Sequence, residues 1–139
     1  MKVAIITAST AVYKGEQEDA SGKVIRKMVE EAGLDVVFMK ALPTDKTVLS
    51  TVFQRMADGN LADLILTTGG TGFSPRDITP EATEDIIDRR VPGIPEAMRA
   101  YSMTITKRAM LSRSTAGIRK KTLIINLPGS PKAVKESLE

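Results

Sequence analysis

Apolar and polar positions along the chain follow two alternating patterns. Between residues 21 and 32, Val24, Met28, Val29 and Ala32 recur at the spacing of one helix face, and most of the charged side chains fall on the other face. The same spacing recurs over residues 46–57. Short apolar runs separate these stretches and are typical of buried strands in a parallel sheet. The pattern therefore predicts helices over 21–32 and 46–57 and strands over 2–7, 35–40, 62–68 and 120–127.

Prolines indicate three further helix starts. Thr79-Pro80-Glu81 predicts an N-cap threonine followed by a proline in the first helical turn. A longer helix is expected near Pro95, and a final one at Pro131 with Ser130 as its N-cap. Strands that alternate with helices form parallel βαβ units, so we expect a three-layer α/β fold: a doubly wound, mostly parallel sheet with helices on both faces. In such sheets ligands bind where the strands end and the helices begin.

Length and composition restrict the possible chemistry. The chain has 139 residues and shows no repeat or linker, so we expect a single domain over 1–139. It contains no Cys and no His, which excludes thiolate chemistry, histidine base catalysis and Cys/His zinc sites. Any metal would be a hard cation held by oxygen ligands, which favours Mg²⁺. No apolar run is long enough for a membrane span or a signal peptide, so we expect no membrane association and a cytoplasmic location.

Charge is distributed unevenly along the chain. Residues 1–96 hold eleven basic and fifteen acidic side chains, whereas residues 97–135 hold nine basic and no acidic ones. Such a segment attracts an anionic ligand, and a solvated basic face without a ligand is an equal alternative. Nucleic acid is the weaker interpretation, because the segment has one aromatic residue, Tyr101, and no nucleic-acid-binding motif. Within the segment, Ser112 and Arg113 are candidate anion contacts, although most arginines simply face solvent.

A glycine-rich stretch, "TTGGTG", follows the predicted strand at 62–68. Glycines permit positive φ and let backbone N–H groups converge on an anion, and the threonine hydroxyls add further donors. The stretch is neither a Walker A loop nor a Rossmann fingerprint, because no Gly-Lys-Ser/Thr and no GxGxxG is present. The alternative is a tight turn required only by close packing. We take Thr68, Gly69, Gly70, Thr71 and Gly72 as candidate binding residues.

Two aspartates also follow predicted strands. Asp77 comes shortly after the glycines, and Asp45 follows the strand at 35–40. Both are candidate ligands for a Mg²⁺ ion that faces a phosphate. The alternatives are that Asp77 pairs with Arg76 or caps a helix, and that Asp45 or Thr44 caps the helix that follows it.

Two more connections lie at the same expected edge of the sheet. Pro128-Gly129-Ser130 follows the strand at 120–127 and leads into the final predicted helix, which could bind an anionic group or be an ordinary connection. The long polar segment 9–22 follows the first strand, and Asp19 closes it at the helix start. Ser9 and Asp19 are therefore candidate binding residues as well.

Four stretches carry a family resemblance: "DASG", "LILTTGGTGFSPRDITPEAT", "MLSRSTAGIR" and "LIINLPGSPKAVKESL". Together they resemble the MogA/MoaB family of molybdenum-cofactor biosynthesis proteins, to which the gephyrin G-domain type belongs, and the resemblance covers essentially the whole chain. It implies a molybdopterin-binding domain that is usually a homotrimer. In Mog-type members it implies transfer of an adenylyl group from Mg²⁺-ATP to molybdopterin, with release of pyrophosphate. The product could then be handed over to a molybdenum-inserting enzyme.

The resemblance also assigns roles to residues. Asp45 and Asp77 match aspartates that the family requires for the transfer, although here Thr44 separates Pro43 from Asp45. The glycine loop and the turn at 128–130 match the binding segments for the two phosphate-bearing substrates. A non-catalytic molybdopterin-binding scaffold of the MoaB type is the alternative. Family members usually continue for one or two helical turns more, so we expect that Glu139 is either a truncation point or a short natural end.

Overall fold

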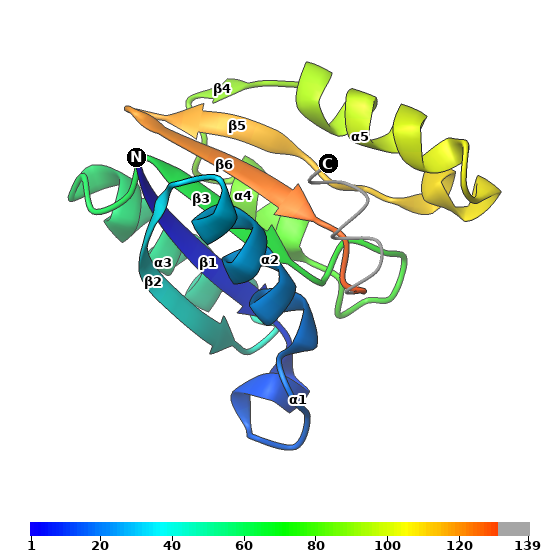
Figure 1. Ribbon diagram of the computed structural model, residues 1–139, viewed down its shortest axis with the longest axis horizontal. Helices are drawn as coiled ribbons and strands as arrows, with labels where there is room; N and C mark the ends of the chain where they lie inside the picture. Colours follow the sequence, from blue (N-terminus) through cyan, green and yellow to red (C-terminus); the bar gives the residue numbers. More distant parts are fainter. Residues whose placement is uncertain (131–139) are drawn as a thin grey trace.

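Helices cover both faces of a six-stranded sheet in the computed structural model, which describes residues 1–130 (Figure 1). The strands are β1 (Lys2–Ala8), β2 (Asp35–Leu42), β3 (Leu64–Thr68), β4 (Arg89–Arg90), β5 (Ala116–Arg119) and β6 (Thr122–Leu127). The helices are α1 (Thr10–Tyr13), α2 (Ala20–Glu31), α3 (Lys46–Asp58), α4 (Thr79–Glu84), α5 (Gly93–Met103) and the 3-10 helix η1 (Lys107–Leu111). The helix predicted from Pro131 lies outside the described residues.

The strand order is β2-β1-β3-β6-β5-β4, and β1 pairs in parallel with both β2 and β3, as β3 does with β6. This confirms the expected mostly parallel sheet. The predicted strand over 120–127 is wrong at its start, because Lys120 has a φ of 53° and lies in the tight turn between β5 and β6. Strand β5 runs antiparallel to β6, and β4 runs antiparallel to β5.

Alternating side chains of β1 point into two separate hydrophobic cores, one on each face of the sheet. The fold therefore has three layers: helices, sheet and helices. Ala4 and Ile6 pack with Phe53 of α3 on one face of the sheet. Val3 and Ile5 pack on the other face with buried apolar side chains of α2. Figure 1 shows α2 in front of the sheet and α3 behind it. The two predicted amphipathic helices therefore lie on opposite faces, as expected for doubly wound units.

Aspartate caps fix the starts of α2 and α3. The Asp19 carboxylate accepts a hydrogen bond from the Gly22 amide (2.9 Å), and the Asp45 carboxylate accepts one from the Val48 amide (3.1 Å). Thr79 is not the N-cap that the sequence predicted. It is the first residue of α4, and Ile78 holds the cap position without a side-chain bond.

The antiparallel strands bring a second segment to the edge of the sheet where β3 and β6 end. Because β5 pairs with β6 in the opposite direction, the start of β5 lies at the carboxyl end of β6, with Ala116 beside Ile125. Residues 92–115 then form a long excursion between β4 and β5, and its base is closed by a hydrogen bond from the Val91 amide to the Ala116 carbonyl (2.9 Å). Figure 1 shows α5 along the outer side of this hairpin. Among residues 1–130, no helix combines the length and apolar character that a membrane span requires.

Candidate functional site

The glycine loop after β3 has a backbone conformation that residues with side chains rarely adopt. Gly69 and Gly70 have φ angles of 88° and 71°, in the left-handed region. A Cβ on Gly69 would lie 2.7 Å from the Ala8 carbonyl oxygen, and a Cβ on Gly70 would lie 2.2 Å from Thr79 Oγ1. Both glycines are therefore required for the close packing of the loop against β1 and α4. The close packing that the sequence left as an alternative is therefore present.

The turn at 128–130 packs directly on this loop. The Thr68 hydroxyl donates to the Pro128 carbonyl (2.5 Å), and the Ser21 hydroxyl donates to the Gly129 carbonyl (2.6 Å). A Cβ on Gly129 would come within 3.4 Å of Gly69 Cα. The structure thus brings together the loop after β3, the turn after β6 and the start of α2, as expected for neighbouring parallel strands.

A small polar cavity lies on the α2 side of this junction. Its volume is about 120 Å³, and we call it the polar cavity. Asp19 accepts hydrogen bonds from both the Thr7 hydroxyl (2.9 Å) and the Gly22 amide, so its carboxylate is fixed at the cavity wall. The sequence-predicted residues that line it are Ser9, Asp19, Thr68, Gly69 and Gly129.

A larger cavity of about 300 Å³ lies on the other side of the glycine loop, and we call it the cationic cavity. Its walls come from the loop, from α5 and from η1, and their described residues include two arginines and no carboxylate. Arg99 Nη1 donates to the Ser114 carbonyl (2.9 Å), which ties α5 to the segment that precedes β5. The lining residues are Thr71, Gly72, Met98, Arg99, Ser102, Thr106, Arg108, Ala109, Leu111, Ser112, Ser114 and Pro128.

Most of the wall from α5 and η1 was missed by sequence reasoning. That reasoning selected Ser112 but neither Arg99 nor Arg108, although both lie in the acid-free segment 97–130. The absence of acidic residues was the signal that could have located this wall. The pattern of the chain could not place it beside the glycine loop, because that placement depends on the antiparallel return of β5.

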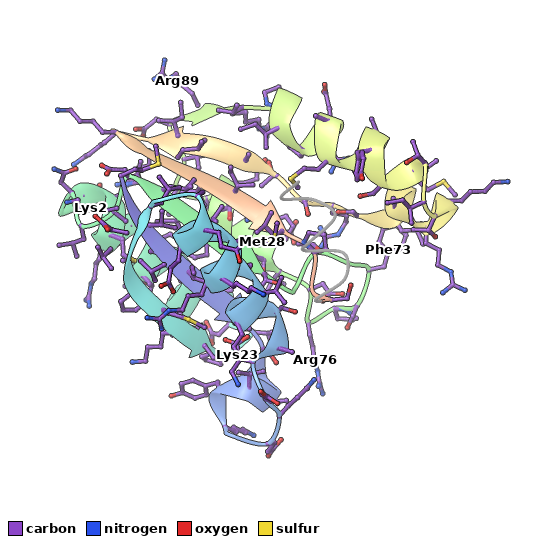
Figure 2. The ribbon with its side chains drawn as sticks, in the orientation of Figure 1. Lys2, Lys23, Met28, Phe73, Arg76 and Arg89 are labelled. Atoms are coloured by element: carbon purple, nitrogen blue, oxygen red, sulfur yellow. The ribbon has the colours of Figure 1, made fainter. Side chains whose placement is uncertain are left out.

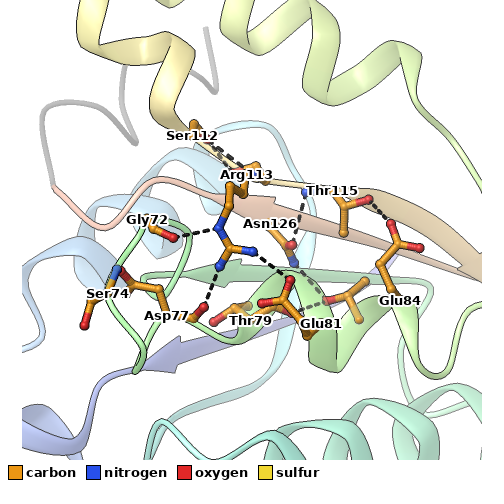
Figure 3. A network of polar contacts seen from close by, with 12 residues as sticks. Gly72, Ser74, Asp77, Thr79, Glu81, Glu84, Ser112, Arg113, Thr115 and Asn126 are labelled. Atoms are coloured by element: carbon orange, nitrogen blue, oxygen red, sulfur yellow. Dashed lines mark hydrogen bonds and ion pairs between the residues drawn. The ribbon is translucent and has the colours of Figure 1, made fainter.

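Arg113 holds the far end of the glycine loop (Figure 3). Its Nε donates to the Gly72 carbonyl (2.7 Å), its Nη2 to the Asp77 carbonyl (2.5 Å) and its Nη1 to the Glu81 carboxylate (2.7 Å). The hydrogen bond with Glu81 raises the pKa of Arg113 above its ordinary value, so the guanidinium stays charged. The structure therefore gives Arg113 a role in positioning the loop, and its contact with a phosphate stays a prediction.

Asp77 lies close to the loop, as the sequence predicted. Its Oδ2 accepts a hydrogen bond from the Ser74 amide (2.9 Å), and a Cβ on Gly72 would lie 2.9 Å from the same oxygen. Phe73 is 71% exposed, and its side chain and that of Arg76 project from different parts of the loop (Figure 2). The pairing of Asp77 with Arg76 that the sequence allowed is absent from the contacts of residues 1–130.

Asp45 lies in a different connection, between β2 and α3. Its neighbour Thr44 contacts Thr10 through their hydroxyl oxygens (3.1 Å), and Thr10 follows Ser9 of the polar cavity. In the described part of the chain, no hydrogen bond joins Asp45 to Asp77. That part also contains no group of three or more Asp, Glu, His or Cys side chains that could hold a metal by themselves. That the two aspartates share a metal stays a prediction.

A buried polar network supports the loop from behind (Figure 3). Asn126 of β6 is fully buried, and its amide nitrogen donates to the hydroxyls of Thr67 (3.1 Å) and Thr83 (3.0 Å). Its amide oxygen accepts a hydrogen bond from the Thr115 amide (3.2 Å). One side chain thus joins β3, α4 and the segment before β5, and it fixes the floor on which the loop rests.

Together, the fold and the site define an α/β protein with two cavities beside glycine-rich connections at the carboxyl ends of parallel strands, the place where sheets of this kind bind ligands. Residues 4–139 match a family described as "Probable molybdopterin binding domain", and the chain belongs to that family.

Curated and solved relatives agree with this assignment. The molybdopterin adenylyltransferase of Helicobacter pylori is 42% identical over 99% of this chain and 79% of its own length. The crystal structure of the molybdopterin biosynthesis enzyme MoaB from Thermus thermophilus is 44% identical, with a TM-score of 0.92 over 99% of this chain and 87% of that one. The molybdopterin biosynthesis Mog protein from Mycobacterium ulcerans is 36% identical, with a TM-score of 0.92 over 99% and 89%.

Proposed function

We propose that the protein is a molybdopterin adenylyltransferase of molybdenum-cofactor biosynthesis. The observation that carries the proposal is the position of the glycine loop, which separates the polar cavity from the cationic cavity and contributes residues to both. Two ligands bound in these cavities would each reach the loop with one end. The name of the Helicobacter pylori relative supports the same reaction.

In this proposal ATP and molybdopterin meet at the loop. The adenosine end of ATP occupies the polar cavity, where the Asp19 carboxylate and the hydroxyls of Ser9 and Thr68 offer hydrogen bonds. The pterin occupies the cationic cavity, between the apolar side chains of Met98 and Leu111. Both phosphate chains then converge on the backbone of Gly69–Gly72 and on the turn at 128–130, where the Ser130 hydroxyl is a further candidate contact.

The chemistry is a single displacement at phosphorus. An oxygen of the terminal phosphate of molybdopterin attacks the α-phosphorus of ATP, and the bond from that phosphorus to the bridging oxygen of the β-phosphate breaks. Adenylyl-molybdopterin and pyrophosphate result. The attacking phosphate is already ionised near neutral pH, so no general base is needed, which suits a chain without His. The protein accelerates the reaction by positioning two anions and by neutralising their charge.

The aspartates fit the way in which proteins bind Mg²⁺ beside phosphates. Such an ion is held by one or two carboxylates together with substrate phosphate oxygens and water, rather than by a cage of protein ligands. In the structure each of Asp45 and Asp77 uses one carboxylate oxygen in a backbone hydrogen bond, which leaves the other for a cation. When bound, Mg²⁺ would neutralise charge on the phosphates. Asp77 is our first choice of ligand because of its position beside Gly72.

The test combines a binding measurement with a product assay. Wild-type protein is incubated with molybdopterin and Mg²⁺-ATP, and pyrophosphate and the adenylylated pterin are measured. We expect Asp77→Asn to bind both substrates, because asparagine can still accept the Ser74 hydrogen bond, but to form no product. Asp85→Asn is a matched control, since it removes an exposed carboxylate that pairs with Lys46 (3.1 Å) and lines neither cavity.

Three outcomes separate the alternatives. Product from wild type and from Asp85→Asn, but not from Asp77→Asn, supports the proposed enzyme. Unchanged turnover in Asp77→Asn removes Asp77 from the mechanism. Tight binding of molybdopterin without any product in the wild-type protein favours the alternative, a molybdopterin-binding scaffold. In such a scaffold Asp19 and Asp45 would act only as helix caps.

We also propose that the protein acts as a homotrimer. Support comes from apolar side chains exposed on α5, on η1 and on the link between them, which a second copy could cover. These are Tyr101, Met103, Ile105, Met110 and Leu111. Sedimentation equilibrium would measure the mass, and a monomer at micromolar concentration would contradict this part of the proposal. A cytoplasmic location and hand-over of the product to a molybdenum-inserting enzyme stay predictions.

A further inference from the structure

Arg108 is a charged side chain without a partner at the cationic cavity. It belongs to η1 and lines the cavity, and its guanidinium has no hydrogen-bond or ion-pair partner within residues 1–130. The other arginine of the cavity, Arg99, donates from Nη1 to the carbonyl of Ser114 and more weakly to that of Ser112. Residues 97–130 contain no acidic side chain, and neither do the other described residues of the lining, so none of them neutralises Arg108.

The two ends of the cavity offer different chemistry. At the loop end, the backbone of Thr71 and Gly72 and the hydroxyls of Ser112 and Ser114 can receive a phosphate. Arg108 brings a full positive charge from η1, on the wall that closes the same cavity against α5. The lining thus suits a ligand that carries a second anionic group apart from its phosphate.

We propose that Arg108 binds the dithiolene sulfurs of molybdopterin, and this inference rests on the proposed function. The terminal phosphate must reach the glycine loop to react, so it is not available to η1. The remaining anionic group of the substrate is the pair of adjacent sulfurs beside the pterin ring. A guanidinium has five N–H donors in a planar fork, and it is weakly hydrated compared with an ammonium, so it can face two neighbouring acceptors at once. Arg108 is then a specificity residue that distinguishes the sulfur-bearing pterin from one without sulfur.

The experiment compares two pterin ligands and three forms of the full chain. The ligands are molybdopterin and a pterin phosphate that lacks the dithiolene, with ATP as a third ligand that reports the integrity of the polar cavity. The proteins are wild type, Arg108→Ala and Lys107→Ala. Lys107 is the matched control because it is the adjacent cation on η1, is exposed, and does not line the cavity. Dissociation constants are measured anaerobically by isothermal titration at low salt.

We expect Arg108→Ala to weaken molybdopterin binding by about tenfold, which corresponds to the loss of one hydrogen-bonded charge contact at a partly solvated site. The affinity for the desulfurised pterin phosphate and for ATP should change by less than about twofold, and Lys107→Ala should leave all three affinities within the same range. Addition of salt should reduce the difference between Arg108→Ala and wild type, because an exposed charge contact is screened.

Other results overturn either the inference or the proposed reaction. An equal loss of affinity for both pterins would show that Arg108 contacts the phosphate or the ring. An equal loss in Lys107→Ala would reduce the effect to the general field of the basic segment. A wild-type protein that forms no product but binds molybdopterin in an Arg108-dependent way would refute only the proposed reaction. A wild-type protein that forms product while Arg108→Ala binds both pterins normally would refute only the inference.

Discussion

The contact between Gly70 and Thr79 allows a stability prediction with a worked magnitude. An alanine at position 70 would have to adopt a φ near 71°, which costs an L-residue about 1–2 kcal/mol. Its Cβ would also lie 2.2 Å from the buried Thr79 Oγ1, and relief of such overpacking costs about 1–3 kcal/mol more. We therefore expect Gly70→Ala to lower the free energy of unfolding by about 2–5 kcal/mol.

A double-mutant cycle separates the two contributions. Thr79→Ala removes the oxygen that clashes and leaves Thr79 Cβ, which lies 3.3 Å from the added methyl position. In that background Gly70→Ala should cost only the backbone strain, about 1–2 kcal/mol, so the coupling energy should be about 1–3 kcal/mol. Urea unfolding of all four proteins is monitored by far-UV circular dichroism, because the chain lacks Trp as a fluorescence probe. All four are measured at one protein concentration, because self-association would shift the midpoint. If Gly70→Ala costs the same in both backgrounds to within about 0.5 kcal/mol, the contact does not limit the packing of the loop.

Three further predictions concern the residues that support the site. Arg113→Lys replaces three directed donors by one ammonium, so the amides of the 72–77 loop should exchange with deuterium about tenfold faster, whereas unchanged protection would show that Arg113 does not hold the loop. Asn126→Ala leaves Thr67, Thr83 and Thr115 without its hydrogen bonds and should lower the free energy of unfolding by about 2–4 kcal/mol in urea titrations; a loss below about 1 kcal/mol would mean that water replaces the amide. The hydrogen bond from Arg119 lowers the pKa of Asp58 in the folded state, so Asp58 stabilises the fold above its unfolded pKa and this contribution is lost as the pH falls through the folded pKa. Asp58→Asn should therefore be less stable than wild type near neutral pH and converge with it in acid, and a difference that does not depend on pH would contradict this.

Four of the six strands in residues 1–130 could be predicted from the sequence: three central ones and β2 at the edge of the sheet. β1, β3 and β6 are recognisable as apolar runs because helices cover them on either side. The strands β5 and β4 were missed because they have four and two residues, too few for a periodic signal, and β5 contains Gly117. A glycine is needed there because a Cβ would lie 2.4 Å from the side chain of Ile87.

The candidate site likewise has one part that could be predicted from the sequence and one part that could not. The meeting of the glycine loop with the turn at 128–130 could be predicted, because β3 and β6 are parallel neighbours whose ends lie side by side. The wall made by Arg99 and Arg108 could not, since it reaches the site through an antiparallel return that leaves no pattern in the sequence. Thr79 shows a third limit: its amide donates to the Gly70 carbonyl (3.2 Å), so tertiary contact draws it into the helix in place of the cap position.

The closed base of the 92–115 excursion has a consequence for how such a protein can diversify. Its two ends leave and re-enter the sheet at the hydrogen bond between Val91 and Ala116, so the stretch over 93–111 can change in length and side chains without breaking a strand pairing. The loop that would hold the phosphates, by contrast, is tied to three strands and tolerates no side chain at Gly69 or Gly70. Variation would therefore accumulate in the wall that faces the distal part of the ligand, while the reacting end stays constant. A set of descendants could exchange one ring system for another and keep the same phosphoryl chemistry.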